Sequence, residues 1–257
     1  MNQFKKIFVM LVLLNTFIMA QGTVGTGAKY EYRTLIDMPT AGILEKGVVG
    51  VTMDMLPEGV VVSRIEVGAF SNFSFGISYG GDNVIGSGKI DWYKLPGVDV
   101  RARIIDETLS MPAITLGFDS QGKGKYDDVL DRYQIKSPGF FAAASKNFEF
   151  LGYLSLHGVI NYSLEREDGD KDLDLQIGAE KTLGSRFSLI AEYDFAVNDN
   201  TGNSLGDGNG YLNMGVRWSV GEGFTVGLNL RDLLDNKKFN SNKADRGLFV
   251  EYVRGIF

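Results

Sequence analysis

The 257-residue chain contains no cysteine and a single histidine, His157. Without cysteine there is no disulfide framework, no thiolate metal site and no cysteine nucleophile. One histidine excludes multi-histidine zinc sites. The 26 lysines and arginines are outnumbered by 32 aspartates and glutamates, so the net charge of −6 gives no overall attraction for nucleic acid. No phosphate-binding or dinucleotide motif occurs either. We therefore predict no cofactor, no metal site and no nucleic-acid partner.

Long hydrophobic runs are also missing after residue 20, where no segment approaches the roughly 18 apolar residues of a spanning helix. The first twenty residues combine a positive start (Lys5, Lys6), an apolar stretch over 7–19 and a small residue, Ala20. This pattern predicts a secretory signal peptide over residues 1–20, with a simple membrane anchor as the alternative.

Proline is scarce, at five residues, whereas glycine (33), phenylalanine (17) and tyrosine (11) are abundant. This mixture is typical of strands joined by tight turns. Period-two alternation of apolar and polar residues runs through most of the chain, and it gives each strand one apolar and one polar face. Twelve strands are predicted, near residues 48–55, 60–69, 73–80, 97–106, 112–119, 139–146, 151–164, 171–181, 187–198, 210–220, 224–231 and 246–254.

Short turns alternate with long polar connections between these strands, which is the layout of an outer-membrane barrel. We predict an all-β fold: a transmembrane antiparallel up-and-down β-barrel of about 12 strands over residues 48–257, in the outer membrane of a Gram-negative cell. An even strand number places both termini on the periplasmic side. A soluble barrel would show the same alternation, with the apolar face turned inward. Three features favour the transmembrane barrel over the soluble one: the export signal, the loop pattern and the terminal aromatic Phe257. A terminal aromatic residue resembles the signal read by the barrel-assembly machinery.

Two segments leave alternatives open. Residues 21–47 precede the alternating region and either lie in the periplasm or enter the lumen as a plug. The 81–96 connection spaces its apolar residues roughly as a helix does, so it is either a short helix or amphipathic turn at the membrane rim or a packed loop.

The polar faces of the strands carry charges of both signs, and on a transmembrane barrel these side chains point into the lumen. Because an unpaired buried charge is costly, we expect them to pair across the interior and to leave a largely occluded barrel. Arg217, Glu192 and Asp194 are expected near its middle. Segregation of the charges to opposite walls would instead suit a wet, selective pore. The candidate lumen network comprises Arg64, Glu66, Arg101, Arg103, Asp119, Glu192, Asp194, Arg217 and Arg231.

Catalytic and metal-binding patterns are not apparent. His157 shares the polar parity of its strand, so we expect it in a polar lumen network rather than in a hydrolase site, and no G-x-S-x-G elbow occurs. The acidic run over 165–174 and the polar stretch over 198–209 lack EF-hand spacing. We interpret both as solvated loop tips, with calcium binding as the alternative.

Three short motifs resemble the YjbH-type exopolysaccharide outer-membrane proteins: MPTAGIL at 38–44, PAITLGFD at 112–119 and FAAASK at 141–146. Members of that family are usually longer lipoproteins, so this chain is similar to a short, single-barrel, non-lipidated variant. The resemblance implies a non-enzymatic accessory or structural component of envelope polysaccharide export. The alternative is a narrow passive pore for small solutes. The implied partners are outer-membrane lipid, the barrel-assembly machinery through Phe257, and polysaccharide or export proteins.

Overall fold

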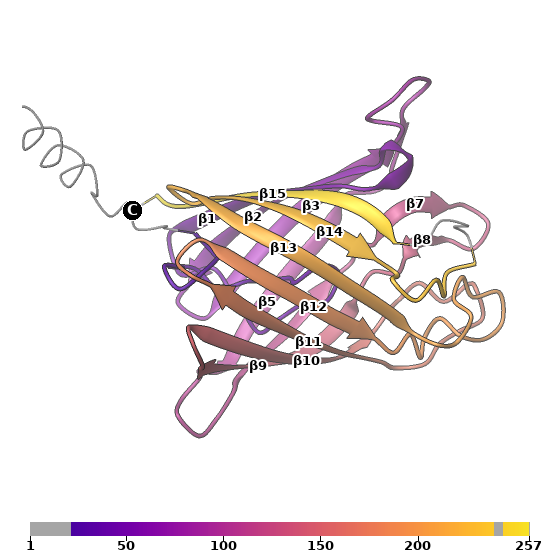
Figure 1. The fold of residues 1–257 in the computed structure, drawn as a ribbon. Coiled ribbons are helices and arrows are strands. Elements are labelled where there is room, and N and C mark those ends of the chain that lie inside the picture. The colour runs from indigo at the N-terminus through magenta and orange to yellow at the C-terminus, as the bar shows by residue number, and fades with distance from the viewer. Residues whose placement is uncertain (1–21, 239–243, 257) are drawn as a thin grey trace, which may run out of the picture.

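The computed structural model describes residues 22–238 and 244–256, so the predicted signal peptide and Phe257 lie outside the described residues. Twelve antiparallel strands close into a barrel, and the predicted fold class is confirmed (Figure 1). The barrel closes where β1 pairs with β15, with Val48 opposite Gly255 and Met55 opposite Leu248. The wall consists of β1 (Val48–Met55), β2 (Val61–Phe70), β3 (Phe73–Asp82), β5 (Gly97–Ile105), β6 (Ala113–Asp119), β9 (Gly139–Glu149), β10 (Tyr153–Tyr162), β11 (Asp174–Leu183), β12 (Phe187–Asp194), β13 (Tyr211–Gly221), β14 (Phe224–Arg231) and β15 (Asp245–Gly255).

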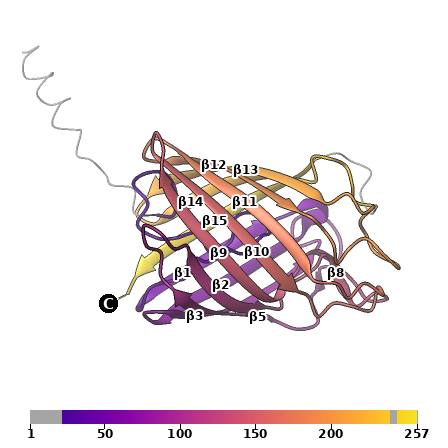
Figure 2. The same cartoon turned by 90° about the horizontal axis from the view of Figure 1, so that it is seen from below.

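The two rims of the barrel differ. At one rim, which we call the turn end, the connections after β2, β9, β11 and β13 are tight, and the chain leaves β15 there (Figures 1 and 2). At the other rim, the loop end, lie long connections and a separate hairpin formed by β7 (Lys123–Asp127) and β8 (Arg132–Ile135). The connection after β1 is only a 3₁₀ turn over Pro57–Gly59.

The alternative of a short helix over residues 81–96 is wrong. A short strand, β4 (Asp91–Trp92), pairs there with the loop end of β3. The Trp92 ring stacks on Tyr79 with centroids 5.8 Å apart, so its indole lies on the barrel exterior. Tyr93, next in the chain, is buried and donates a hydrogen bond to the carbonyl of Gly124 in the β7–β8 hairpin (2.6 Å). Among the described residues, no helix is long and apolar enough to cross a membrane.

The apolar parity faces outward. Along β13, Met214, Val216 and Trp218 each leave more than 40% of their surface exposed, whereas Arg217 between them is fully buried in the interior. A soluble barrel would have the opposite arrangement, because its apolar side chains must fill the core. The soluble alternative is therefore excluded by the direction of the side chains.

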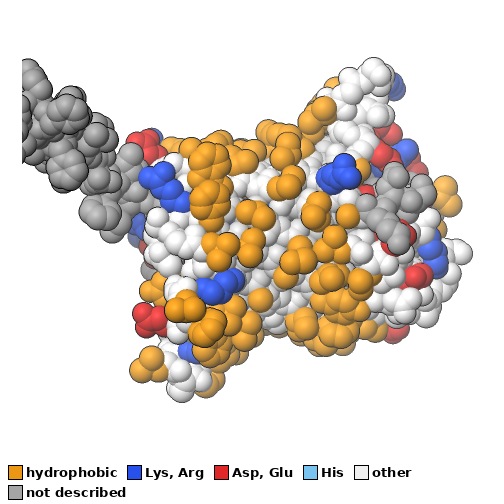
Figure 3. All heavy atoms as spheres, viewed as in Figure 1, with side chains coloured by type: hydrophobic (Ala, Val, Ile, Leu, Met, Phe, Trp, Pro, Cys, Tyr) orange, Lys and Arg blue, Asp and Glu red, His pale blue; other side chains and the backbone are white. Residues whose placement is uncertain are grey.

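Aromatic side chains gather near both rims of the exterior, as in transmembrane barrels. Figure 3 shows hydrophobic side chains over the strands of one face, with most acidic and basic side chains toward the two ends. Ring pairs at the turn end are Phe70–Phe73 and Phe187–Trp218; those at the loop end are Tyr79–Trp92, Phe118–Phe140 and Tyr193–Phe195.

Candidate functional site

Residues 22–47, here called the inner segment, occupy the interior of the barrel. The segment starts at the turn end, where the Thr26 N–H donates to the carbonyl of Gly184 (3.0 Å). It reverses direction in a turn over residues 35–38, closed by a bridge between Thr34 and Pro39, and then continues into β1. Residues 22–47 thus lie inside the barrel wall.

Apolar side chains at and just after the turn of the inner segment pack on an apolar patch of the inner wall. Leu35, Ile36, Met38 and Ala41 are each at most 1% exposed. Their cluster includes wall residues from β6, β9, β10 and β12: Ala113, Phe141, Ala143, Val159 and Ile190. Burying an aliphatic side chain contributes about 1.5–3 kcal/mol. This patch is therefore a substantial part of what holds the segment in place.

Wall glycines make room for the segment. A β-carbon at Gly178 on β11 would lie 2.5 Å from Cδ1 of Leu35 and 3.1 Å from the sulfur of Met38. A β-carbon at Gly68 on β2 would lie 1.8 Å from the carbonyl oxygen of Glu45. A real β-carbon would not come within 2.5 Å of another non-bonded atom, so only glycine at these two positions allows the inner segment to touch the wall.

The carboxylate of Glu192, on β12, binds the main chain of the turn. Its two oxygens accept hydrogen bonds from the N–H groups of Ile36 (2.9 Å), Asp37 (2.8 Å) and Met38 (3.1 Å). Asn213 donates a fourth hydrogen bond to the same carboxylate (2.9 Å). Three successive N–H groups directed at one carboxylate form a concave anion site, as in other turns of this kind.

Three wall arginines bind carbonyl groups of the segment. Arg217 donates to the carbonyl of Leu35 (2.9 Å), Arg101 to that of Arg33 (2.6 Å) and Arg103 to that of Ala41 (3.1 and 2.7 Å). The inner segment has almost no secondary structure of its own, and buried main-chain groups must be hydrogen-bonded. The charged wall therefore supplies the partners that a sheet or helix would otherwise provide.

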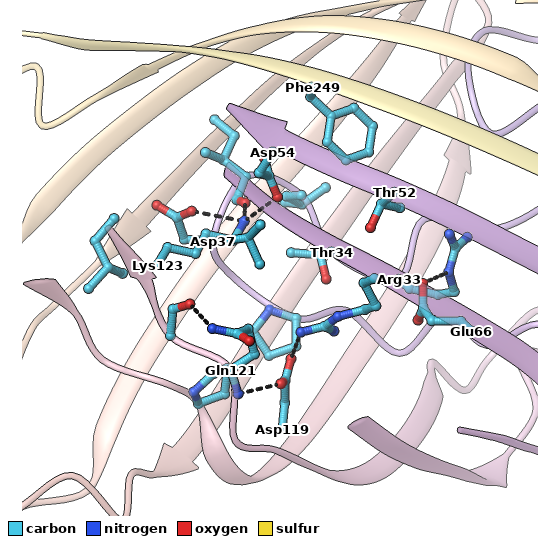
Figure 4. A pocket seen from close by; sticks show the side chains of 18 of the residues that line it. Arg33, Thr34, Asp37, Thr52, Asp54, Glu66, Asp119, Gln121, Lys123 and Phe249 are labelled. Atoms are coloured by element: carbon cyan, nitrogen blue, oxygen red, sulfur yellow. Dashed lines mark hydrogen bonds and ion pairs between the residues drawn. The ribbon is translucent and has the colours of Figure 1, made fainter. Parts of the chain in front are cut away.

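Charged side chains of the segment complete the attachment. Arg33 pairs with Glu66 on β2 (3.0 Å) and with Glu251 on β15. Asp37, at the turn, pairs with Arg231 on β14 (2.9 Å) and with Lys123 on β7 (3.1 Å). Figure 4 shows Arg33, Asp37, Glu66 and Lys123 around a cavity of about 50 Å³ on the loop side of the turn.

All nine residues of the predicted lumen network lie on the inner face of the wall, seven of them buried and Arg64 and Asp194 partly buried. Only Arg64 and Asp119 pair directly with each other (2.6 Å). The expectation that Arg217, Glu192 and Asp194 form ion pairs near the middle is wrong: none of the three does so among the described residues. The inner segment fills the space across which they would pair, and it takes up the hydrogen bonds of Arg217 and Glu192.

Arg217 is fully buried and has no carboxylate partner among residues 22–238 and 244–256; other groups stabilise its charge. Besides the carbonyl of Leu35, it contacts the amide oxygen of Asn229 (2.6 Å). Its guanidinium lies 4.4 Å from the ring centroid of Phe249, a distance at which the aromatic face attracts a cation.

Sequence reasoning did not identify Arg33, Asp37 and Lys123 as members of this site. The first two lie outside the alternating strands, and Lys123 lies on β7, a short polar strand outside the barrel wall. Period-two alternation reports only on the wall, so it carries no signal for these positions.

A second cavity, of about 270 Å³, lies between the inner segment and the wall on the turn side. His157 lines it and faces the interior, as its parity predicts; its Nδ1 lies 2.8 Å from the hydroxyl of Ser145. That hydroxyl also accepts the N–H of Ala41 (3.0 Å), so Ser145 helps to bind the segment. Among the described residues, no group of three or more His, Asp or Glu is arranged to hold a metal ion.

The chain was compared with known proteins. No family model and no curated protein matches it. Among solved structures, the KdgM porin is 12% identical, with 80% of this chain and 98% of that chain aligned and a TM-score of 0.51. The NanC porin (9% identity, 81% and 100% coverage, TM-score 0.42) and Omp33 of Acinetobacter baumannii (9%, 80% and 96%, 0.45) are also similar. The likeness to the KdgM porin shows that this chain shares the fold of a porin.

Proposed function

We propose that this chain is a non-enzymatic outer-membrane barrel that acts as a narrow pore for small solutes and is closed by its own inner segment. The observation that carries the proposal is that the segment contributes no strand to the wall. Side chains of six wall strands bind the segment, and these side chains would line an open lumen if the segment were absent: they lie on β2, β5, β12, β13, β14 and β15. The porin fold supports the same class.

The rival function is an accessory role in envelope polysaccharide export, which the YjbH-type resemblance implies. The MPTAGIL motif of that resemblance, residues 38–44, belongs to the returning half of the inner segment. The inner segment adds no strand to the wall and occupies the space that a pore would use as its lumen. The use of charged side chains to bind a non-wall segment therefore favours the pore.

For the location we propose the outer membrane of a Gram-negative cell, with lipid around the apolar exterior and the turn end toward the periplasm. On this orientation the inner segment enters the barrel from the periplasm. Recognition by the barrel-assembly machinery through Phe257 belongs to the same proposal, although Phe257 lies outside the described residues.

The experiment that tests the pore is planar-bilayer conductance of two proteins. One is the wild type; in the other, residues 31–43 are replaced by a Gly/Ser sequence of the same length, which leaves the wall intact. We expect a mostly silent wild type and steady ohmic steps from the variant. Heat-modifiable mobility on gels verifies that the strands of the variant still form a folded barrel wall.

A folded variant that stays silent would favour the accessory role and refute the pore. A wild type with large, steady conductance would refute closure by the inner segment.

A further inference from the structure

Two aspartates face the interior side by side at the loop end of neighbouring strands. Asp174 is the first residue of β11 and Asp194 the last residue of β12. The side-chain nitrogen of Gln176 donates to both carboxylates, at 3.2 Å from Asp174 and 3.1 Å from Asp194. A single nitrogen atom therefore bridges two anionic groups.

This pair differs from the other interior carboxylates. Asp99, Asp119 and Glu66 each pair with an arginine. Neither Asp174 nor Asp194 forms an ion pair within residues 22–238 and 244–256, although Asp174 is only 1% exposed. Two adjacent carboxylate charges without a cation are costly where one of them, Asp174, is buried and the other is partly buried, so the arrangement calls for a positively charged partner.

Two amide oxygens beside the pair also have no hydrogen-bond partner in the part of the chain that the structure describes. Asn161 on β10, 3% exposed, donates its amide hydrogen to the carbonyl of Pro138, while its Oδ1 accepts nothing. Gln176, 8% exposed, uses its nitrogen on the two aspartates, while its Oε1 accepts nothing. The strand register sets Asn161 opposite Asp174 and Gln176 opposite Asp194.

These four side chains line one cavity of about 30 Å³. A cavity of that size holds one water molecule or one ion. Its lining offers carboxylate and amide oxygens in excess of hydrogen-bond donors, and hard cations bind such sets.

We propose that this cavity binds Ca²⁺ through the carboxylates of Asp174 and Asp194 and the amide oxygens of Asn161 and Gln176, with water completing the coordination. Calcium accepts six to eight oxygen ligands in flexible geometry, whereas Mg²⁺ demands a tighter octahedron and keeps its water. The bound ion joins β10, β11 and β12 at the loop end. The sequence favours solvated loop tips for the acidic run over 165–174, with calcium binding as the alternative. Asp168, Asp170 and Asp174 are each 1% exposed, so the interpretation as solvated tips is wrong at these positions.

Lys136 lines the same cavity, and its charge sets a limit on the affinity. Its ammonium lies 2.7 Å from the carboxylate of Asp168 and 2.7 Å from the carbonyl of Asn198, so it is bound on the loop side. With two carboxylates and a nearby cation, we expect a dissociation constant of about 10⁻⁴–10⁻³ M, in the range of extracellular calcium modules.

The test is calorimetric titration of the full-length, chelator-treated protein in detergent with CaCl₂, a readout that does not depend on conductance. The Asp194→Asn variant removes one ligand charge. The matched control is Asp172→Asn, which removes the same charge from an exposed position two residues before the site. We expect the control to bind as the wild type does and Asp194→Asn to bind at least about tenfold more weakly.

A second variant, Asn161→Asp, adds a carboxylate to the site and should tighten calcium binding several-fold. Its melting temperature should rise with Ca²⁺ and fall with EDTA more than that of the wild type. No binding by the wild type at about 10 mM Ca²⁺ would overturn the proposal. Equal calcium binding by Asp194→Asn and the wild type would also overturn it, as would melting temperatures that do not change with calcium in any variant. Either result would indicate that the two aspartates share a proton instead of binding a cation.

Discussion

Glu192 offers the sharpest test of how the inner segment is held. Its carboxylate accepts three main-chain hydrogen bonds from Ile36, Asp37 and Met38 at 2.8–3.1 Å. In Glu192→Gln, one oxygen becomes an NH₂ group that faces N–H donors, and the charge is lost. Hydrogen bonds to charged groups contribute about 1.5–3 kcal/mol each, and the one remaining oxygen retains part of this. We expect the closed state to lose about 2–4 kcal/mol of stability relative to the state with the inner segment displaced. The displaced fraction, meaning the fraction of molecules whose inner segment has left the lumen, should therefore rise about 30- to 1,000-fold.

Because the chain has no cysteine, the displaced fraction can be measured by thiol labelling. A Met38→Cys background places one thiol at a position that is 1% exposed in the closed state. The maleimide labelling rate, measured where closing is faster than labelling, is proportional to the displaced fraction. Single-channel open probability should increase in parallel. The control is Glu149→Gln, an exposed glutamate at the turn end of β9. Equal labelling rates in Glu192→Gln and the control, with both barrels folded, would refute the role of Glu192 in closure.

Three further predictions concern the wall and the loops. Gly178→Val should displace the inner segment and raise the Met38→Cys labelling rate, whereas Gly158→Val, where a β-carbon meets nothing within 4 Å, should leave that rate unchanged. Val216→Arg on the lipid face should cost about 2–4 kcal/mol if it lies near the bilayer midplane, as measured by urea unfolding in lipid vesicles; wild-type stability would contradict the assigned face. Burial would raise the pKa of Asp199 at the loop end, but the hydrogen bonds from Arg132 outweigh it and hold that pKa below its usual range. The stability from this contact is therefore present above about pH 4 and lost as the pH falls through the lowered value, so hydrogen-exchange protection of residues 195–210, corrected for intrinsic rates, should drop in that window.

The wall was predictable from sequence because each strand needs opposite chemistry on its two faces. Strand ends were less predictable. The stretch expected over 187–198 ends as β12 at Asp194, because Ala196 adopts a positive φ of 49° and its N–H turns to the carboxylate of Asp194 (2.7 Å). The hairpin of β7 and β8 was not predicted, because it too depends on side-chain contacts rather than on period-two alternation. Its short polar strands are fixed by packing of Tyr126 and Tyr133 rings at 4.9 Å rather than by alternation.

The placement of the inner segment was not predictable from its own residues. Most of its attachment uses main-chain groups, which every sequence possesses, and the specific partners lie on the wall: Glu192, Arg217, Arg101 and Arg103. The wall charges could be found by parity. Their partners could not, because a charge facing a lumen is equally compatible with water, with another charge or with a peptide segment.

That ambiguity bears on how the proposed pore would open. When the inner segment leaves, Arg217 and Glu192 lose their peptide partners, and water must replace them, because an unsolvated charge at that depth costs several kcal/mol. The same side chains therefore favour two states, one in which they bind the segment and one in which they line a hydrated lumen. The apolar cluster of Leu35, Ile36 and Met38 has no such second state, since its exposure to water is unfavourable. On the proposed function, the charges thus make an open lumen tolerable, and burial of the apolar turn supplies the bias toward the closed state.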